Sequence, residues 1–459
     1  MRADLKVGPS IASIASLCNA LLAADMIRRR TVTRNILSLL AAVCVAGSSL
    51  FAESWPNWRG PSLDGVSRET NLPTRWSATE NVAWKLPLPA FSGSTPVIWN
   101  DLVFLNVATA RATGQIELWT VDRRTQQVVW RRPIVGENRI GNKQNMSSPS
   151  PVTDGQRVWV MSGTGVLKAF DVGGRELWAR NLQQDYGAFG LQFGYGSSPL
   201  LHAGNLYVQV LHGFFTDDPS YVLRIDALTG KTVWRTERPT PALHESPDSY
   251  TTPTVVQHSG RTEIITTGGD LVTGHDGATG KELWRADVLN PNRARNFRII
   301  PSPLIAGGLI IASTRVRPLV ALRPGGSGDV SASHVAWTFE RGPDVPTPVS
   351  DGTYLYLVSE QGVVYCVELQ TGTLVYGPVR LPPDFYSASP LLADGKLYAT
   401  GETTGVTTVF RAGPTFEILA SNTFGDPCAP YCLSSIAVSQ GQLFVKTDAH
   451  LWVVGERRP

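Results

Sequence analysis

YVLRIDALTGKTVWR, at residues 221–235, decides the fold, because weaker copies of it recur along nearly the whole chain. Residues 222–225 are mostly β-formers, Asp226 favours an Asx turn, and Gly230 permits a positive φ before a second strand that ends at Trp234. The repeated unit is therefore predicted to be a β-hairpin. Related copies lie at 118–130, 167–178, 272–284 and 363–376, with eroded copies at 319–337 and 406–419.

A second hairpin precedes each copy, and it begins with Ser or Thr followed by proline. Its first residues are Thr95-Pro96, Ser150-Pro151, Ser198-Pro199, Thr252-Pro253, Ser302-Pro303, Thr347-Pro348 and Ser389-Pro390, with an eighth copy at Ser435-Ile436 that lacks the proline. Two hairpins in every ~40 to 55 residues match the period of a propeller blade. Eight such units fit a closed ring.

The two ends of the repeat region complement each other. The last unit supplies three strands after Ser434 and stops before a closing Trp strand, whereas residues 81–88 hold Trp84 with no hairpin before it. Pairing these ends would remove the exposed sheet edges of an open array. The prediction is an all-β, eight-bladed β-propeller of four-stranded blades, with the last blade closed by an N-terminal strand.

Three segments are expected along the chain. Residues 1–52 resemble a secretory signal, since arginines at 28–30 and 34 precede a short apolar run at 36–45; Met26 is an alternative start, and a membrane anchor is the other interpretation. Residues 53–80 form a lead-in whose three tryptophans need burial, so it is expected to pack on the propeller. Residues 81–459 form the propeller itself.

Charge and cysteine content limit the function. Six of the 41 basic and two of the 38 acidic residues lie in 1–52, so the remainder is close to neutral and no electrostatic argument for nucleic-acid binding survives. No apolar run long enough for a membrane span follows the leader. Cys428 and Cys432 are close enough in sequence for a disulfide, with a free pair as the alternative, and Cys366 is expected in the core.

Long insertions mostly precede the Ser/Thr-Pro strands, so they should gather on one face of the ring and carry any binding site. The candidates for binding a ligand or partner are Asn145, Tyr195, His244, Glu245, Asp248, Arg295, Arg298, Asp384 and Tyr386. Ordinary solvated loop polarity is the alternative for each. No metal-binding, nucleophile or phosphate-loop spacing is present, so no catalytic residue and no metal site is assigned.

The repeats resemble the pyrroloquinoline quinone (PQQ) enzyme repeat over residues 81–454, on the pattern in which LxALDxxTGKxxW follows a Gly-turn hairpin. The resemblance implies that the Trp of each copy docks between neighbouring blades. The residues concerned are Trp84, Trp130, Trp178, Trp234, Trp284 and Trp337. Quinoprotein dehydrogenases share these repeats with cofactor-free propellers such as the outer-membrane assembly factor BamB.

A PQQ enzyme requires a calcium ion held by oxygens, an Asp base and basic groups near the axis. The inner strands carry one acid, Asp351, at a turn, although loop residues such as Glu245 and Asp248 could still serve. Clustered carboxylates and a Lys or Arg beside a planar slot would favour the enzyme, and an apolar or water-filled funnel would favour a scaffold.

We therefore expect an exported, non-catalytic, monomeric binding or scaffold module of the periplasm or cell exterior, with an envelope protein or small molecule as its partner and no cofactor. A PQQ- and calcium-dependent alcohol or sugar dehydrogenase is the alternative. A polysaccharide-binding propeller is a third, weaker one.

Overall fold

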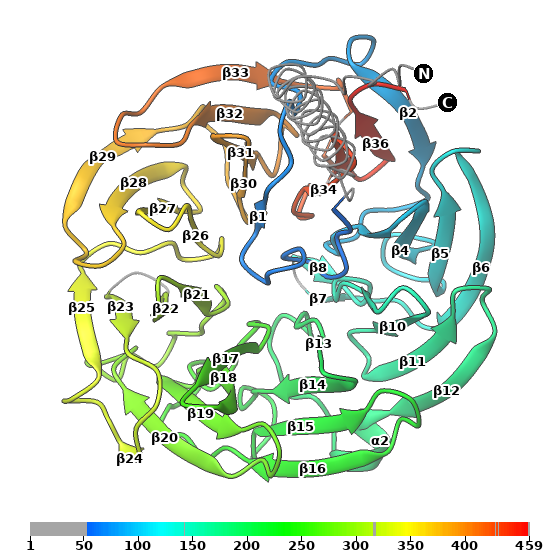
Figure 1. The fold of residues 1–459 in the computed structure, drawn as a ribbon. Coiled ribbons are helices and arrows are strands. Elements are labelled where there is room, and N and C mark those ends of the chain that lie inside the picture. Colours follow the sequence, from blue (N-terminus) through cyan, green and yellow to red (C-terminus); the bar gives the residue numbers. More distant parts are fainter. Residues whose placement is uncertain (1–52, 142, 315–317, 427, 430, 458–459) are drawn as a thin grey trace, which may run out of the picture. The chain divides into compact units, whose positions relative to one another are not determined.

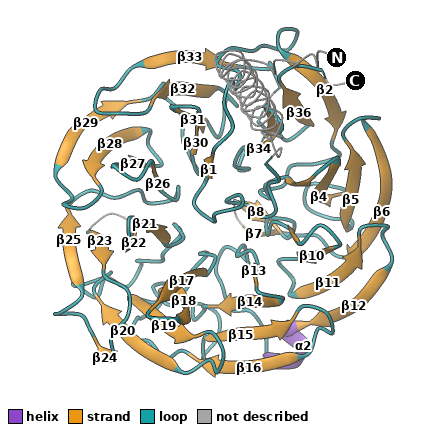
Figure 2. Ribbon diagram, viewed as in Figure 1, coloured by secondary structure: helices purple, strands orange, loops and turns teal. Residues whose placement is uncertain are grey.

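Eight antiparallel sheets stand around a central axis like the blades of a propeller (Figure 1). The structure is a computed structural model that describes residues 53–141, 143–314, 318–426, 428–429 and 431–457. The predicted leader, with Met26, lies outside these residues. Within the described ranges strands dominate, and one short helix, α2 (Leu182–Tyr186), follows its cap Asn181 (Figure 2).

Each blade contains four strands in order from the axis outward. Blade 1 holds β3 (Val97–Trp99), β4 (Leu102–Ala108), β5 (Ile116–Asp122) and β6 (Gln127–Val135). Blade 2 holds β9 (Val152–Thr153), β10 (Arg157–Met161), β11 (Val166–Asp171) and β12 (Glu176–Asn181). Blade 3 holds β13 (Leu200–His202), β14 (Asn205–Val210), β15 (Tyr221–Asp226) and β16 (Thr232–Glu237). Blade 4 holds β17 (Thr254–His258), β18 (Arg261–Gly268), β19 (Leu271–Asp276) and β20 (Glu282–Asp287).

The second half of the ring repeats this order. Blade 5 holds β21 (Leu304–Ala306), β22 (Leu309–Ala312), β23 (Leu319–Leu322) and β25 (Val335–Phe339). Blade 6 holds β26 (Val349–Ser350), β27 (Tyr354–Val358), β28 (Val363–Glu368) and β29 (Leu374–Arg380). Blade 7 holds β30 (Leu391–Ala393), β31 (Lys396–Thr400), β32 (Thr407–Arg411) and β33 (Ile418–Asn422). Blade 8 holds β34 (Ala437–Ser439), β35 (Gln442–Lys446), β36 (His450–Val454) and β2 (Val82–Pro87).

The N-terminal strand closes the ring. β2 pairs antiparallel with β36, with Trp84 opposite Val453, so the last blade takes its outer strand from the start of the propeller. This confirms the predicted closure and removes the free edges of an open array. Short strands add to two blades: β1 (Val66–Ser67) runs parallel to β30, and β24 (Gly328–Asp329) runs parallel to β20. A separate two-stranded sheet pairs β7 (Ile140–Gly141) with β8 (Gln144–Asn145).

The turn of the defining repeat has the geometry that its residues favour. The carboxylate Oδ1 of Asp226 accepts hydrogen bonds from the amides of Leu228 and Thr229 at 3.0 and 2.8 Å. Gly230 has a φ of +70° and donates its N–H to the carbonyl of Asp226 at 2.9 Å. Asp276 and Gly280 repeat this arrangement in blade 4. The Asp and Gly of each full copy therefore build the hairpin together.

The tryptophan of the preceding blade packs directly against the glycine of this turn. A Cβ added at Gly280 would lie 2.5 Å from the Trp234 ring, and one added at Gly230 would lie 2.7 Å from the Trp178 ring. The indole N–H of each tryptophan donates to the next blade's turn: Trp130 to Val172, Trp178 to Ala227, Trp234 to Gly277 and Trp337 to Leu369.

Trp284 and Trp84 differ from this pattern. The N–H of Trp284 donates to Glu263 of its own blade at 2.8 Å, although its ring packs in a cluster that includes Ile310 of blade 5. Trp84 packs edge-on against Phe444 in a cluster that also contains Val103 of blade 1. The apolar core thus lies between neighbouring blades.

The lead-in follows the propeller and crosses its centre (Figure 1). Trp55 exchanges two backbone hydrogen bonds of 2.8 Å with Ile98 of blade 1, and Trp76 packs with Tyr398 of blade 7 and with Phe424. The division at residues 52 and 80 stays a prediction. No helix within the described ranges is long and apolar enough to cross a membrane.

Candidate functional site

A belt of hydrogen bonds joins the innermost residues of neighbouring blades. The backbone N–H of the Ser or Thr in one blade donates to the side-chain hydroxyl of its counterpart in the next. These links, at 2.8 to 3.1 Å, run Thr95 to Ser150 to Ser198 to Thr252 to Ser302 to Thr347 to Ser389 to Ser435. Since the hydroxyl oxygens from Ser150 to Ser435 accept in the belt, their own hydrogens remain for a partner inside the ring.

A lysine links the last blade, blade 8, to the segment that precedes blade 1. The ammonium Nζ of Lys446, in β35, donates to the carbonyl and to the hydroxyl of Ser94, the latter at 3.0 Å. The Ser434 hydroxyl donates to the same carbonyl at 2.9 Å. Lys446 is buried and forms no ion pair with a carboxylate of the described residues, and burial lowers its pKa to about 7.

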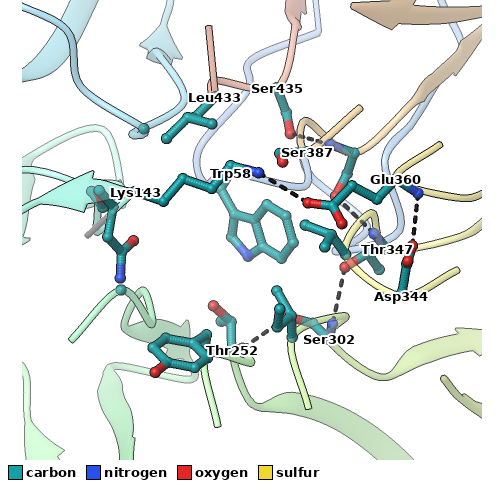
Figure 3. Close-up of a pocket in the computed structure, with 18 of the residues that line it drawn as sticks. Trp58, Lys143, Thr252, Ser302, Asp344, Thr347, Glu360, Ser387, Leu433 and Ser435 are labelled. Atoms are coloured by element: carbon teal, nitrogen blue, oxygen red, sulfur yellow. Dashed lines mark hydrogen bonds and ion pairs between the residues drawn. The ribbon is translucent and has the colours of Figure 1, made fainter. Parts of the chain in front are cut away.

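The belt residues line an axial cavity of about 710 Å³ (Figure 3). The indole of Trp58, from the lead-in, lies among them. Trp58 also lines a much smaller cavity shared with Arg59, which is buried and donates to the carbonyls of Pro348 and Pro390 at 2.6 and 3.3 Å. The lead-in therefore provides a floor for the axial cavity.

Charged side chains are paired on the wall of the cavity. Lys143 places its Nζ 3.0 Å from Glu360 Oε1 and 2.7 Å from Glu402 Oε2, and Glu402 is 2% exposed (Figure 3 shows the first pair). The Ser387 hydroxyl also donates to Glu402. Burial alone would lower the pKa of Lys143, but the hydrogen bonds and charges of Glu402 and Glu360 raise it above its usual value. The lysine is therefore a cation held between two carboxylates.

Two more groups complete the wall. The carboxylate of Asp344 accepts the amide N–H of Glu360 at 2.7 Å, and burial raises the pKa of Asp344. Arg298, which also lines the cavity, pairs with Glu245 and lies 4.5 Å from the centre of the Phe193 ring. Arg298 is the predicted binding residue found among the described residues that line the cavity.

The other predicted binding residues hold loops in place. Asn145 donates to the Phe91 carbonyl and accepts from Ser147, and the Tyr195 hydroxyl donates to the Gln209 carbonyl. Asp248 accepts three backbone N–H groups, from residues 192, 213 and 214. Their polarity is used inside the protein, which leaves ligand binding by these three as a prediction that no contact supports.

Four further predicted residues lie away from the cavity lining. Asp384 accepts from the amides and hydroxyls of Thr403 and Thr404, and the Tyr386 hydroxyl donates to the Pro382 carbonyl. His244 contacts Asn296, while the backbone carbonyl of Arg295 accepts the Glu245 amide. The structure brings together Glu245 and Arg298 from this predicted set as a direct side-chain pair.

Sequence reasoning missed the centre of the site. The sequence predicts burial of Trp58 with the other lead-in tryptophans, with a partner-binding aromatic patch as the alternative, and it does not single out Lys143, Asp344 or Glu360. The available signal was the repeat itself, because the residue two positions before each belt serine or threonine lines the cavity, and so does the turn after the second strand of blade 6. Glu360 stands at such a turn, directly after β27 and Ser359.

Cys428 and Cys432 form a disulfide with a Cα–Cα distance of 5.2 Å. The amide of Cys432 donates to the backbone carbonyl of Glu402 at 2.8 Å, so the loop is fixed beside the Lys143 cluster. Cys366 is a buried free thiol in β28, and burial raises its pKa to about 12.

Comparisons with known proteins agree on the fold. A family model described as outer membrane protein assembly factor BamB matches residues 66–188 and, in an overlapping match, 116–377. Comparison with curated proteins finds no match. Among solved structures, BamB from Moraxella catarrhalis is similar with a TM-score of 0.57 at 12% identity, covering 82% of this chain and 98% of that one. A europium-containing methanol dehydrogenase is similar with a TM-score of 0.67 at 10% identity, covering 88% and 98%.

Proposed function

The chain belongs to the PQQ-like propeller family whose model is described as outer membrane protein assembly factor BamB, and on that premise we propose that it is an exported, monomeric binding module of the cell envelope. Recognition takes place at the axial cavity, and the protein performs no redox chemistry of its own. Its partner is an envelope protein or a small molecule that reaches the open side of the ring.

The observation that carries this proposal is the bridge from Lys143 to Glu360 and Glu402. Carboxylates and a lysine do stand beside the planar Trp58, an arrangement that by itself would favour the enzyme. In this cavity, however, the lysine forms ion pairs with both glutamates and so occupies an oxygen of each. A paired carboxylate is a poor general base and a poor calcium ligand, because the cation must first be displaced.

The residues do not fit a calcium-bound quinone. Calcium takes six to eight oxygen ligands, usually with several carboxylates. Within the described ranges no group of three or more His, Cys, Asp or Glu side chains could hold a metal ion. Asp248 and Asp384, which could have supplied ligands, are occupied by backbone and hydroxyl donors. No catalytic step is therefore derived through PQQ.

Rigidity supports the binding role. The belt links neighbouring blades at the axis, and the tryptophans that pack on the next blade's turn link them near the rim. A surface built on such a ring keeps its shape when it meets a partner, which reduces the entropy lost on binding. The basic residues and apolar run of the leader support export, although they lie outside the described residues.

Calorimetric titration with PQQ and calcium chloride, followed by a dye-linked alcohol and sugar oxidation assay, tests the proposal. We expect no saturable heat and no turnover, together with co-purification of an envelope protein after gentle extraction. Turnover that depends on both PQQ and calcium would establish the dehydrogenase instead.

A further inference from the structure

We propose that the axial cavity binds a neutral saccharide, seated on the indole of Trp58 and held by the hydroxyl belt. This inference rests on the proposed function, since it names the class of ligand taken by the same cavity. Three independent features of the cavity support it: an aromatic floor, a ring of hydroxyl groups and the lack of surplus positive charge among the described residues.

Trp58 is a fixed aromatic surface. Its neighbour Arg59 is anchored to carbonyls of blades 6 and 7, and the Asn57 side chain closes the local turn by accepting the Arg59 amide at 2.9 Å and donating to Gly60 at 2.7 Å. The indole is half-buried and lies in the middle of the cavity (Figure 3). An indole face offers apolar contact with little loss of side-chain entropy, which suits the C–H face of a pyranose ring.

The belt surrounds this surface with hydroxyl groups. Its eight Ser and Thr side chains all line the cavity. From Ser150 to Ser435 each hydroxyl can rotate its hydrogen toward a ligand while its oxygen accepts from the neighbouring blade. A saccharide hydroxyl also both donates and accepts. The cavity volume of about 710 Å³ falls in the range of small-molecule sites.

The charges at the cavity favour a neutral ligand over an anionic one. Lys143 lies between two carboxylates, Glu360 and Glu402, and Arg298 pairs with a third, Glu245, so these cations leave no surplus positive charge. The remaining lining charges, Arg341 and Asp344, have opposite signs. A tricarboxylate such as PQQ or a phosphate ester would find no excess of positive charge, whereas charged groups that are already paired still hydrogen-bond to neutral hydroxyls.

The test is titration of the full-length protein with cellobiose and maltose, followed by calorimetry and tryptophan fluorescence. We expect saturable binding of at least one of them, with an affinity that stays unchanged from low salt to about 0.5 M NaCl. Trp58→Ala should weaken binding by about tenfold or more, which corresponds to the loss of one good stacking contact, and should remove the fluorescence change. Glu360→Gln should weaken binding by a smaller factor.

Phe215→Ala is the matched control, because Phe215 is 69% exposed and is not among the residues that line the cavity. It should bind like the wild type. Urea midpoints for every variant separate lost binding from lost folding, and Trp58→Phe retains an aromatic floor if the alanine variant unfolds.

Absence of saturable binding by folded wild-type protein to either sugar would overturn the saccharide inference. Equal binding by wild type and a folded Trp58→Ala variant would overturn it as well. Without dye-linked turnover these results leave the binding module standing, so the two proposals fail separately.

Discussion

The backbone nitrogen of Thr252 lies 2.8 Å from the hydroxyl oxygen of Ser302, and this contact between neighbouring blades is repeated around the axis from Thr95 to Ser435. The Ser/Thr-Pro motif is thus more than a strand signal. The residue before proline is held extended, so that its N–H and its hydroxyl both serve the belt.

Removing one hydroxyl from the belt should cost stability. Ser302→Ala leaves the buried Thr252 N–H without its protein acceptor and should lower the free energy of unfolding by about 1 to 3 kcal/mol. Ser302→Thr is the control, because threonine occupies the equivalent position in blades 1, 4 and 6. Urea denaturation measures both variants, and equal midpoints for them would contradict a role for the hydroxyl.

The contact between Gly280 and the Trp234 ring predicts a loss of stability greater than that from backbone strain alone. Gly280→Ala meets both a φ of +77° and the Trp234 ring, whereas Gly260→Ala in the same blade meets a φ of +75° with nothing within 4 Å of the new Cβ. Both should lose about 1 kcal/mol from the left-handed backbone, and Gly280→Ala should lose about 1 to 3 kcal/mol more from overpacking. Thermal or urea unfolding compares them. An equal loss of unfolding free energy in the two variants would show that the Trp234 ring shifts to accommodate the new methyl group without destabilising the fold.

The charged cluster predicts non-additive effects. Lys143→Met leaves the buried carboxylate of Glu402 with Ser387 as its remaining side-chain donor, and should destabilise the protein by about 2 kcal/mol or more. Glu402→Gln added to that variant removes the uncompensated charge and should restore part of the loss. A double-mutant cycle by urea unfolding gives the coupling energy, and strictly additive effects would contradict the pairing.

Lys446 predicts a pH-dependent stability. Its pKa falls from an ordinary value of 10.5 in the unfolded chain to about 7 in the fold, so the unfolded state binds more protons between these values. Stability must then rise with pH across that window, by about 2 kcal/mol between pH 7 and 9. Lys446→Met lacks the titrating ammonium group and keeps the Ser94 carbonyl bonded to Ser434.

The comparison of the two proteins by urea unfolding at several pH values isolates the lysine, because all other titrating groups are shared. Parallel pH profiles for wild type and Lys446→Met would show that the ammonium is paired and ordinary in the fold.

The sequence by itself determined the strands, the hairpins, the number of blades and the closing strand. Those features follow from local rules: Asp226 and Gly230 build a turn within five residues, and the repeat multiplies it around a ring. Even the closure could be predicted, since an incomplete blade at one end and a lone Trp84 strand at the other leave one sensible pairing.

The tertiary structure alone decided the contents of the cavity. Lys143 and Glu360 are 217 residues apart, and Arg59 reaches a carbonyl 331 positions along the chain. Such contacts depend on how the closed ring folds its loops and lead-in toward the axis, which no local propensity encodes. For the same reason most of the predicted binding residues bond to neighbouring segments of the protein itself, as Asp248 does to the amides of residues 192, 213 and 214: a polar residue in an insertion satisfies protein groups as readily as a ligand.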